Sequence, residues 1–144
     1  MNELANPLEL CGFEFIEFVA KDKELDEIFQ TIGFSKVAKH KSKNVYLWRQ
    51  GNINIILNYQ PESAAAYFFK EHGPSACAMG FRTKDAAKAF NKAIELGAEP
   101  IYSKIGPMEL NIPAIKGIGG SPIYLVDRDI YQSDFIFFDD VASH

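Results

Sequence analysis

Phe18-Val-Ala-Lys-Asp22 and Phe81-Arg-Thr-Lys-Asp85 are two short stretches that share a phenylalanine, a lysine and an aspartate at identical spacing. Each stretch leads into an amphipathic segment that stops at a glycine, Gly33 in the first copy and Gly97 in the second. Self-similarity at a long period is typical of a duplicated structural module. We therefore predict that each copy consists of a strand, a helix capped by the aspartate, and a glycine that ends the helix.

The segments that follow each helix complete the two modules. Runs rich in branched and aromatic residues predict strands. These runs are 11–20, 34–40, 44–50 and 52–58 in the first copy, and 76–82, 99–102, 122–127 and 135–138 in the second. Residues 128–133 are predicted to form a turn. The sequence thus predicts an α+β fold in which two β-α-β-β-β modules form a curved eight-stranded sheet, with the helices on the outer faces and the concave faces turned toward each other.

The same pattern gives the domain organisation. We expect an N-terminal arm over 1–10, a single domain over 11–138 and a tail over 139–144. Within the domain, the first module covers 11–60, a linker helix covers 61–74 and the second module covers 75–138.

Apolar residues of the helices predict how the chain packs. In the first helix, Leu25, Ile28, Phe29 and Ile32 fall at helical spacing, which indicates one apolar stripe against the sheet. Tyr67-Phe-Phe69, in the linker, is a candidate for an apolar contact patch outside the core.

Composition and charge narrow the possible functions. A chain of 144 residues with 47% hydrophobic and 24% charged residues is typical of one globular domain. A net charge of -4 gives no basic surface, so we expect no nucleic-acid partner. Cys11 and Cys77 lie in apolar contexts, which favours reduced core residues of a cytoplasmic protein. The sequence shows no signal-peptide pattern and no apolar run of about 20 residues, so we expect no membrane association.

Two acidic residues of the first strand, Glu14 and Glu17, are the first candidates for acid–base chemistry. Their odd separation places them on opposite faces of a regular strand, so they cannot act as a pair. A carboxylate that faces the concave side needs a partner, for which Arg82 and Lys116 are candidates. We expect structural pairing rather than catalysis.

The three histidines do not form the pattern of a metal site. His40 stands between two lysines, which is typical of a solvated strand end or turn, and His72 precedes Gly73-Pro74 at a helix end. An iron site of the facial-triad type needs two histidines and one carboxylate that converge. We therefore assign no catalytic, cofactor-binding or metal-binding residue to this chain.

Specific motifs are spread along almost the whole chain. They include Asn6-Pro-Leu8, Gly12-Phe-Glu-Phe-Ile-Glu-Phe18, Glu71-His-Gly-Pro-Ser75, Gly106-Pro-Met-Glu-Leu110 and Leu110-Asn-Ile-Pro-Ala-Ile-Lys-Gly-Ile-Gly-Gly120. Through these motifs the chain resembles the N-terminal domain of the bacterial 4-hydroxyphenylpyruvate dioxygenase family, within the vicinal oxygen chelate superfamily of glyoxalase I, extradiol dioxygenases and bleomycin-resistance proteins. The resemblance implies an Fe(II)-dependent enzyme of tyrosine catabolism that converts 4-hydroxyphenylpyruvate and O₂ to homogentisate and CO₂.

The resemblance also implies that this chain lacks the iron site. Enzymes of the family are much longer, and their two histidines and one glutamate belong to a C-terminal domain. By position, the ligands would fall near Glu14, near Ala78, and near Asp134 or Phe135, and neither Ala78 nor Phe135 can bind iron. The implied partners are the C-terminal catalytic domain and further copies of the chain in a homo-oligomer. The alternative is a standalone protein of the superfamily that binds a small ligand in its cup.

Overall fold

The structure is a computed structural model that describes residues 5–21, 23–59, 70, 72–101 and 112–139. Within these residues the chain forms one mixed sheet of nine strands, in the order β6-β7-β8-β5-β1-β4-β3-β2-β9. The strands are β1 (Leu10–Val19), β2 (Ser35–His40), β3 (Val45–Gln50), β4 (Ile53–Asn58), β5 (Ser75–Thr83), β6 (Pro100–Ile101), β7 (Ala114–Lys116), β8 (Pro122–Val126) and β9 (Phe135–Phe137). The described helices are α1 (Asp26–Thr31), α3 (Ala86–Glu95), α4 (Ile130–Asp134) and a 3₁₀ turn, η1 (Ile118–Gly120).

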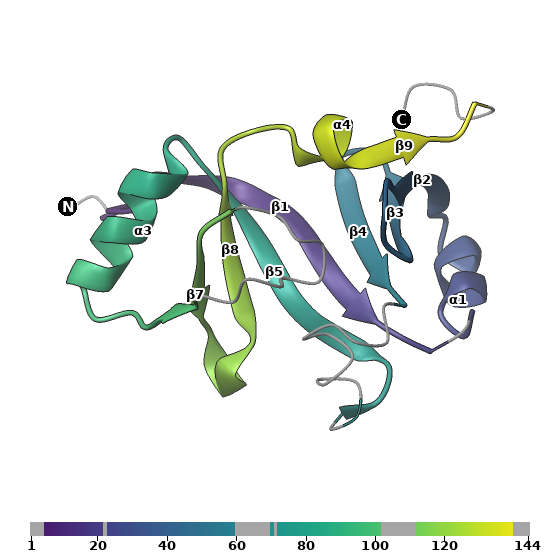
Figure 1. Cartoon of the computed structure of the whole chain (residues 1–144), viewed down its shortest axis with the longest axis horizontal. Coiled ribbons are helices and arrows are strands. Elements are labelled where there is room, and N and C mark those ends of the chain that lie inside the picture. The colour runs from purple at the N-terminus through teal and green to yellow at the C-terminus, as the bar shows by residue number, and fades with distance from the viewer. Residues whose placement is uncertain (1–4, 22, 60–69, 71, 102–111, 140–144) are drawn as a thin grey trace.

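The predicted duplication is visible in the pairing of the strands. The opening strands of the two modules, β1 and β5, are antiparallel neighbours in the middle of the sheet (Figure 1). On its other side, β1 pairs in parallel with β4, and β5 pairs in parallel with β8 in the equivalent way. The α+β fold built from two β-α-β-β-β modules is therefore confirmed.

The described sheet has nine strands rather than the predicted eight, because β7 forms over residues for which no strand was predicted and pairs with β6 and β8. The predicted strand over 135–138 is β9, which joins the first module rather than the second. β9 runs antiparallel to β2, with Phe135 opposite His40. The chain reaches this edge through α4, which lies where a turn over 128–133 was predicted. Asp129 begins this helix, since its carboxylate accepts a hydrogen bond from the backbone N–H of Tyr131 at 3.0 Å.

The two long helical predictions have different outcomes. In α3, the Asp85 side chain accepts a hydrogen bond from the Lys88 backbone N–H at 3.0 Å, and Gly97 follows the helix with φ +107°, as predicted. In α1, the N-cap is Leu25, which makes no side-chain capping bond, so the prediction of Asp22 as the N-cap is wrong. Asp22 itself lies outside the described residues.

The apolar stripe predicted for the first helix is only partly buried. Phe29 is buried, and its ring lies 5.4 Å from that of Phe18 and 5.6 Å from that of Trp48. Ile28 and Ile32, in contrast, are more than half exposed. The helix has six residues, so it presents fewer than two turns to the sheet.

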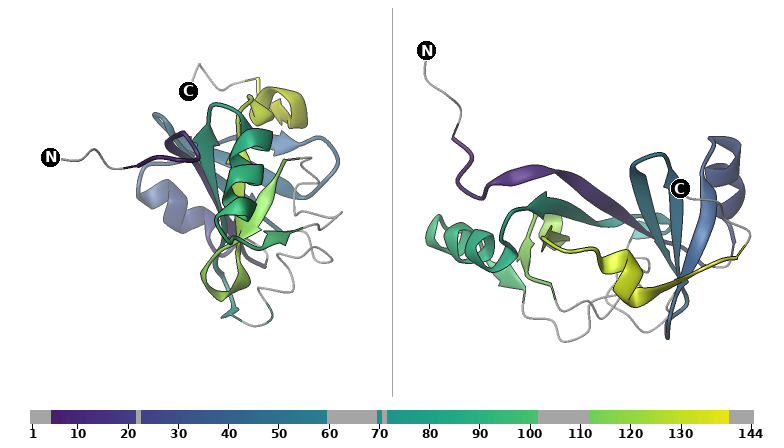
Figure 2. Two further views of the ribbon diagram at one scale, coloured as in Figure 1. Left: turned by 90° about the vertical axis from the view of Figure 1, so that its left-hand side faces the viewer. Right: turned by 90° about the horizontal axis from the view of Figure 1, so that it is seen from above.

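Side chains pack on both faces of the sheet. Both α1 and α3 lie on the face that we call the outer face, where Phe29 packs near Leu57 and Ala89 packs near Leu125. The two helices cover opposite ends of this face (Figure 2). The other face, here the inner face, carries the largest buried cluster, to which α4 and β9 contribute Ile130, Tyr131 and Phe135.

Some predictions fall on residues that the structure does not describe. These are most of the linker helix over 61–74, the Tyr67–Phe69 patch, and residues 140–144 of the tail. Among the described residues, none of the helices has the length and apolar character needed to cross a membrane.

Candidate functional site

Glu14 and Glu17 point to the same face of the sheet, which corrects the prediction that they face opposite ways. The register of β1 against β5 shifts across Glu14. A β-bulge of this kind adds one residue to a strand and changes the direction of the neighbouring side chains. Glu14 consequently reaches Asn54, and Glu17 reaches Asn58, four residues further along the same face of β4.

Glu17 is fully buried in the inner-face cluster. Its Oε2 atom accepts a hydrogen bond from Nδ2 of Asn58 at 3.0 Å, while its Oε1 atom has no partner among the residues that the structure describes. Burial raises the pKa of Glu17 from 4.5 to about 7, although the Asn58 amide and the Cys77 thiol lower it. The group therefore changes its charge near neutral pH.

The neighbours of Glu17 are poor nucleophiles. Burial, followed by the charge of Glu17, raises the pKa values of the Cys77 thiol and the Tyr124 hydroxyl. Because the thiolate is the reactive form of cysteine, Cys77 is an inert core residue, as predicted. The matching prediction for Cys11 is wrong, since Cys11 is exposed near the start of β1.

Glu14 is the centre of a second, more accessible polar network. Its carboxylate accepts hydrogen bonds from the Tyr131 hydroxyl at 2.8 Å, from Nε of Arg82 at 3.1 Å and from Nδ2 of Asn54 at 3.4 Å. Arg82 is thus the predicted partner of an inward carboxylate. Lys116, the other candidate, pairs instead with Glu99 at 3.2 Å.

Arg49 extends this network toward the edge of the sheet. Its Nε atom donates to Oδ1 of Asn54 at 2.7 Å, and its guanidinium lies 5.0 Å from the ring centre of Tyr131 and 5.3 Å from that of Phe137. Burial, and then the charge of Glu14, raise the pKa of Tyr131, so its hydroxyl stays protonated and acts as a hydrogen-bond donor.

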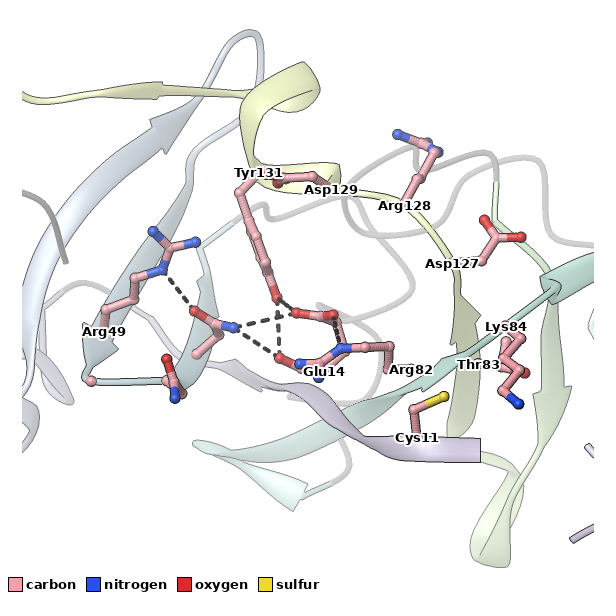
Figure 3. A pocket seen from close by; sticks show the side chains of 13 residues that line it. Cys11, Glu14, Arg49, Arg82, Thr83, Lys84, Asp127, Arg128, Asp129 and Tyr131 are labelled. Atoms are coloured by element: carbon pink, nitrogen blue, oxygen red, sulfur yellow. Dashed lines mark hydrogen bonds and ion pairs between the residues drawn. The ribbon is translucent and has the colours of Figure 1, made fainter. Parts of the chain in front are cut away.

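These residues line a polar pocket of about 800 Å³ beside β1, β4, β5 and α4 (Figure 3). Its remaining lining includes Cys11, Thr83 and Lys84, with Asp127, Arg128 and Asp129 from the segment after β8. Tyr131, Arg49 and Asn54 had no role predicted from the sequence. The sequence could have identified Asn54 as a candidate site residue, because Asn54 and Asn58 are polar residues on one face of an otherwise apolar strand.

Two of the positions that the resemblance assigned to iron ligands, Ala78 and Phe135, hold buried apolar residues. Ala78 is buried on β5, opposite Glu17 rather than Glu14. Phe135 is buried on β9, five strands away from β5 in the sheet order.

His40 is buried rather than solvated, which corrects the prediction. Its Nδ1 atom accepts hydrogen bonds from the backbone N–H groups of Ser42 at 3.1 Å and Lys43 at 3.2 Å, and its ring packs edge-on against Phe135. These bonds organise the turn between β2 and β3. The prediction that His40 marks a strand end or turn is therefore right in place but wrong in exposure.

The described side chains do not fit a two-histidine, one-carboxylate iron site. No group of three or more histidine, cysteine, aspartate or glutamate residues within them is arranged to hold a metal ion. The polar groups that interact with Glu17 are the Asn58 amide, the Cys77 thiol and the Tyr124 phenol.

Comparison with known sequences gives a consistent result. The family model described as "Hydroxyphenylpyruvate dioxygenase, HPPD, N-terminal" matches residues 4–140. The chain is 56% identical to 4-hydroxyphenylpyruvate dioxygenase of Pseudomonas sp. (strain P.J. 874), covering 96% of this chain and 41% of that protein. It is 51% identical to hemolysin VllY of Vibrio vulnificus, covering 99% of this chain and 42% of that protein. The chain therefore spans about two fifths of the length of these relatives.

Comparison with solved structures supports the fold. A xylose isomerase-like TIM barrel/4-hydroxyphenylpyruvate dioxygenase fusion protein matches with a TM-score of 0.83 and 37% identity, over 94% of this chain and 23% of that one. A methylmalonyl-CoA epimerase from Mycobacterium tuberculosis matches with a TM-score of 0.68 and 18% identity, over 91% of this chain and 96% of that one, and shows the fold alone.

Proposed function

This chain belongs to the family of hydroxyphenylpyruvate dioxygenase N-terminal domains, and from this membership we propose that it serves as the non-metal-binding, structural domain of a 4-hydroxyphenylpyruvate dioxygenase. The whole enzyme converts 4-hydroxyphenylpyruvate and O₂ to homogentisate and CO₂, as a step of tyrosine catabolism in the cytoplasm. The observation that carries the proposal is the family match over 4–140 together with 56% identity to an enzyme of that name.

In this proposal, Fe(II) is bound by a C-terminal catalytic domain, which supplies the oxygen chemistry. The support is twofold. The relatives are much longer than this chain, so they contain a further region of sufficient size. In addition, Ala78 and Phe135 occupy positions where the family resemblance would require ligands, and both side chains are buried and apolar.

The role of this domain is to pack against the catalytic domain and to support a homo-oligomer. An apolar patch on the outer face, between the ends covered by α1 and α3, supports this role. We define the patch by Phe13, Phe81 and Ile53. The rings of Phe13 and Phe81 lie 4.9 Å apart, and Phe13 and Ile53 are 64% and 58% exposed. Exposed aromatic and aliphatic side chains in one patch are typical of interaction sites.

The first test is an activity assay. The purified chain is incubated with Fe(II), 4-hydroxyphenylpyruvate and O₂, and homogentisate is measured by liquid chromatography. We expect no homogentisate, while the Pseudomonas relative under the same conditions provides the positive control. Turnover by the isolated chain would overturn the assignment of the chemistry to a separate domain.

The second test concerns the partner. The chain is mixed with a tagged C-terminal remainder of the Pseudomonas relative, and retention is measured. We expect retention of the chain, and a loss of at least tenfold in affinity for Ile53→Ser. Ile136→Ser is the matched control, because Ile136 is 59% exposed on β9 and outside the patch. Equal retention of both variants, or no retention of the unmodified chain, would argue against docking through this patch.

A further inference from the structure

The polar pocket beside Glu14 holds more positive than negative side chains. Its cationic lining residues are Arg49, Arg82, Lys84 and Arg128, and its acidic lining residues are Glu14, Asp127 and Asp129. This excess of positive charge contrasts with the net charge of -4 of the whole chain. The pocket is thus a local cationic site on an acidic protein.

The acidic side chains of the pocket are already engaged in holding the fold. Asp127 accepts a hydrogen bond from the backbone N–H of Ala86, in the first turn of α3, at 2.7 Å. Asp129 caps α4, and Glu14 accepts hydrogen bonds from three different side chains. Their negative charge is therefore partly satisfied by fixed donors within the protein.

Two of the cations face the pocket without an acidic partner. Lys84 makes no ion pair or hydrogen bond with any residue that the structure describes, and Arg128 donates only to the neutral hydroxyl of Ser133, at 3.0 Å. Both side chains line the pocket on the side away from Arg49 (Figure 3). Arg82, half exposed between the two sides, is bound to Glu14 through its Nε atom.

We propose that this pocket binds the oxyanion group of a small organic molecule, a carboxylate or a phosphate, on the side lined by Lys84 and Arg128. Guanidinium and ammonium groups are the side chains that recognise these anions. The volume of about 800 Å³ lies within the range of pockets that hold small-molecule ligands. This inference goes beyond the proposed function, which gives this domain no ligand of its own.

The test compares matched probes on the 144-residue chain. Phenylacetate carries the carboxylate, phenylacetamide is its neutral counterpart, and inorganic phosphate is the second anion. Binding is measured by titration calorimetry at low ionic strength and by the backbone amide NMR shifts of the lining residues. We expect phenylacetate or phosphate to bind and to shift the amide signals of the pocket residues. Phenylacetamide should bind at least tenfold more weakly than phenylacetate, and added salt should lower the affinity for the anion. Equal binding of acid and amide, or no binding of either anion at about 10 mM, would overturn the proposal.

A pair of charge-matched variants separates a specific site from general attraction. The double variant Lys84→Gln/Arg128→Gln removes the two cations of the pocket, and both side chains are exposed, so the fold should persist. The control Lys88→Gln/Lys92→Gln removes the same charge from α3, outside the pocket lining. We expect the first to weaken anion binding about tenfold or more and the second to leave it nearly unchanged. An equal loss in both would mean that only net charge matters, and would contradict the proposed site.

Discussion

The hydroxyl group of Tyr131 donates a hydrogen bond to Oε2 of Glu14 at 2.8 Å, which joins the C-terminal helix α4 to the first strand of the sheet across 117 positions of sequence. This contact places α4 over the inner face, and it brings β9 to the edge of the first module. Through it, α4 contributes Tyr131 to the lining of the polar pocket (Figure 3).

Tyr131→Phe is expected to lower the free energy of unfolding by about 2 kcal/mol, because a hydrogen bond to a charged and mostly buried acceptor is lost. Urea unfolding monitored by circular dichroism measures the change. Tyr124→Phe is the control, since the Tyr124 hydroxyl makes no hydrogen bond with the described residues, and its effect should be within about 0.5 kcal/mol. Equal effects of the two substitutions would show that the contact with Glu14 does not stabilise the fold.

Glu17 makes stability depend on pH. Its pKa rises from 4.5 to about 7 on folding, so between these pH values the folded state holds a proton that the unfolded state has released. Glu17 therefore makes its whole contribution to the free energy of unfolding below pH 4.5. This contribution, up to about 3 kcal/mol, is lost as the pH rises to about 7. Glu17→Gln, which mimics the protonated form, should be similar to the unmodified chain at pH 4.5 and more stable at pH 8. Parallel stability curves for the two proteins across this range would contradict the raised pKa.

Gly80 provides space for the ring of Phe15. A Cβ atom at position 80 would lie 2.5 Å from Cε2 of Phe15, closer than two carbon atoms can approach. We expect Gly80→Ala to destabilise the fold by about 1–3 kcal/mol through overpacking. In a Phe15→Leu background the same substitution should have a smaller effect, and a double-mutant cycle by thermal unfolding measures the coupling. Additive effects would indicate that position 80 matters for another reason.

The packing of α1 depends mainly on one residue. Phe29→Ala should destabilise the fold by about 3–5 kcal/mol, because the ring is buried against Phe18 and Trp48. Ile28→Ala, at the neighbouring exposed position, should change stability by no more than about 0.5 kcal/mol. Chemical denaturation distinguishes the two, and a large effect of Ile28→Ala would mean that both residues of the predicted stripe are buried in solution.

Much of the fold could be predicted from short-range patterns. The strands, the cap of α3 at Asp85 and the glycine that ends each helix depend on residues within one or two turns of each other. The prediction that the whole apolar stripe of α1 packs against the sheet was only partly right. Helical spacing shows which residues share a face, but not how far the helix extends over the sheet. A turn was predicted over 128–133, although Asp129 is a residue type that favours the start of a helix, and it caps α4 in the structure.

By itself, the sequence determined the duplicated α+β module, the helix caps and stops, and the absence of histidines where the family resemblance would require iron ligands. Only the tertiary structure decided that Glu14 and Glu17 share a face and that Tyr131 lines the pocket. A β-bulge arises from the pairing of β1 with a distant strand, and alternation along one strand cannot reveal it. In the same way, the Tyr131–Glu14 contact exists only once the sheet has brought the two ends of the domain together.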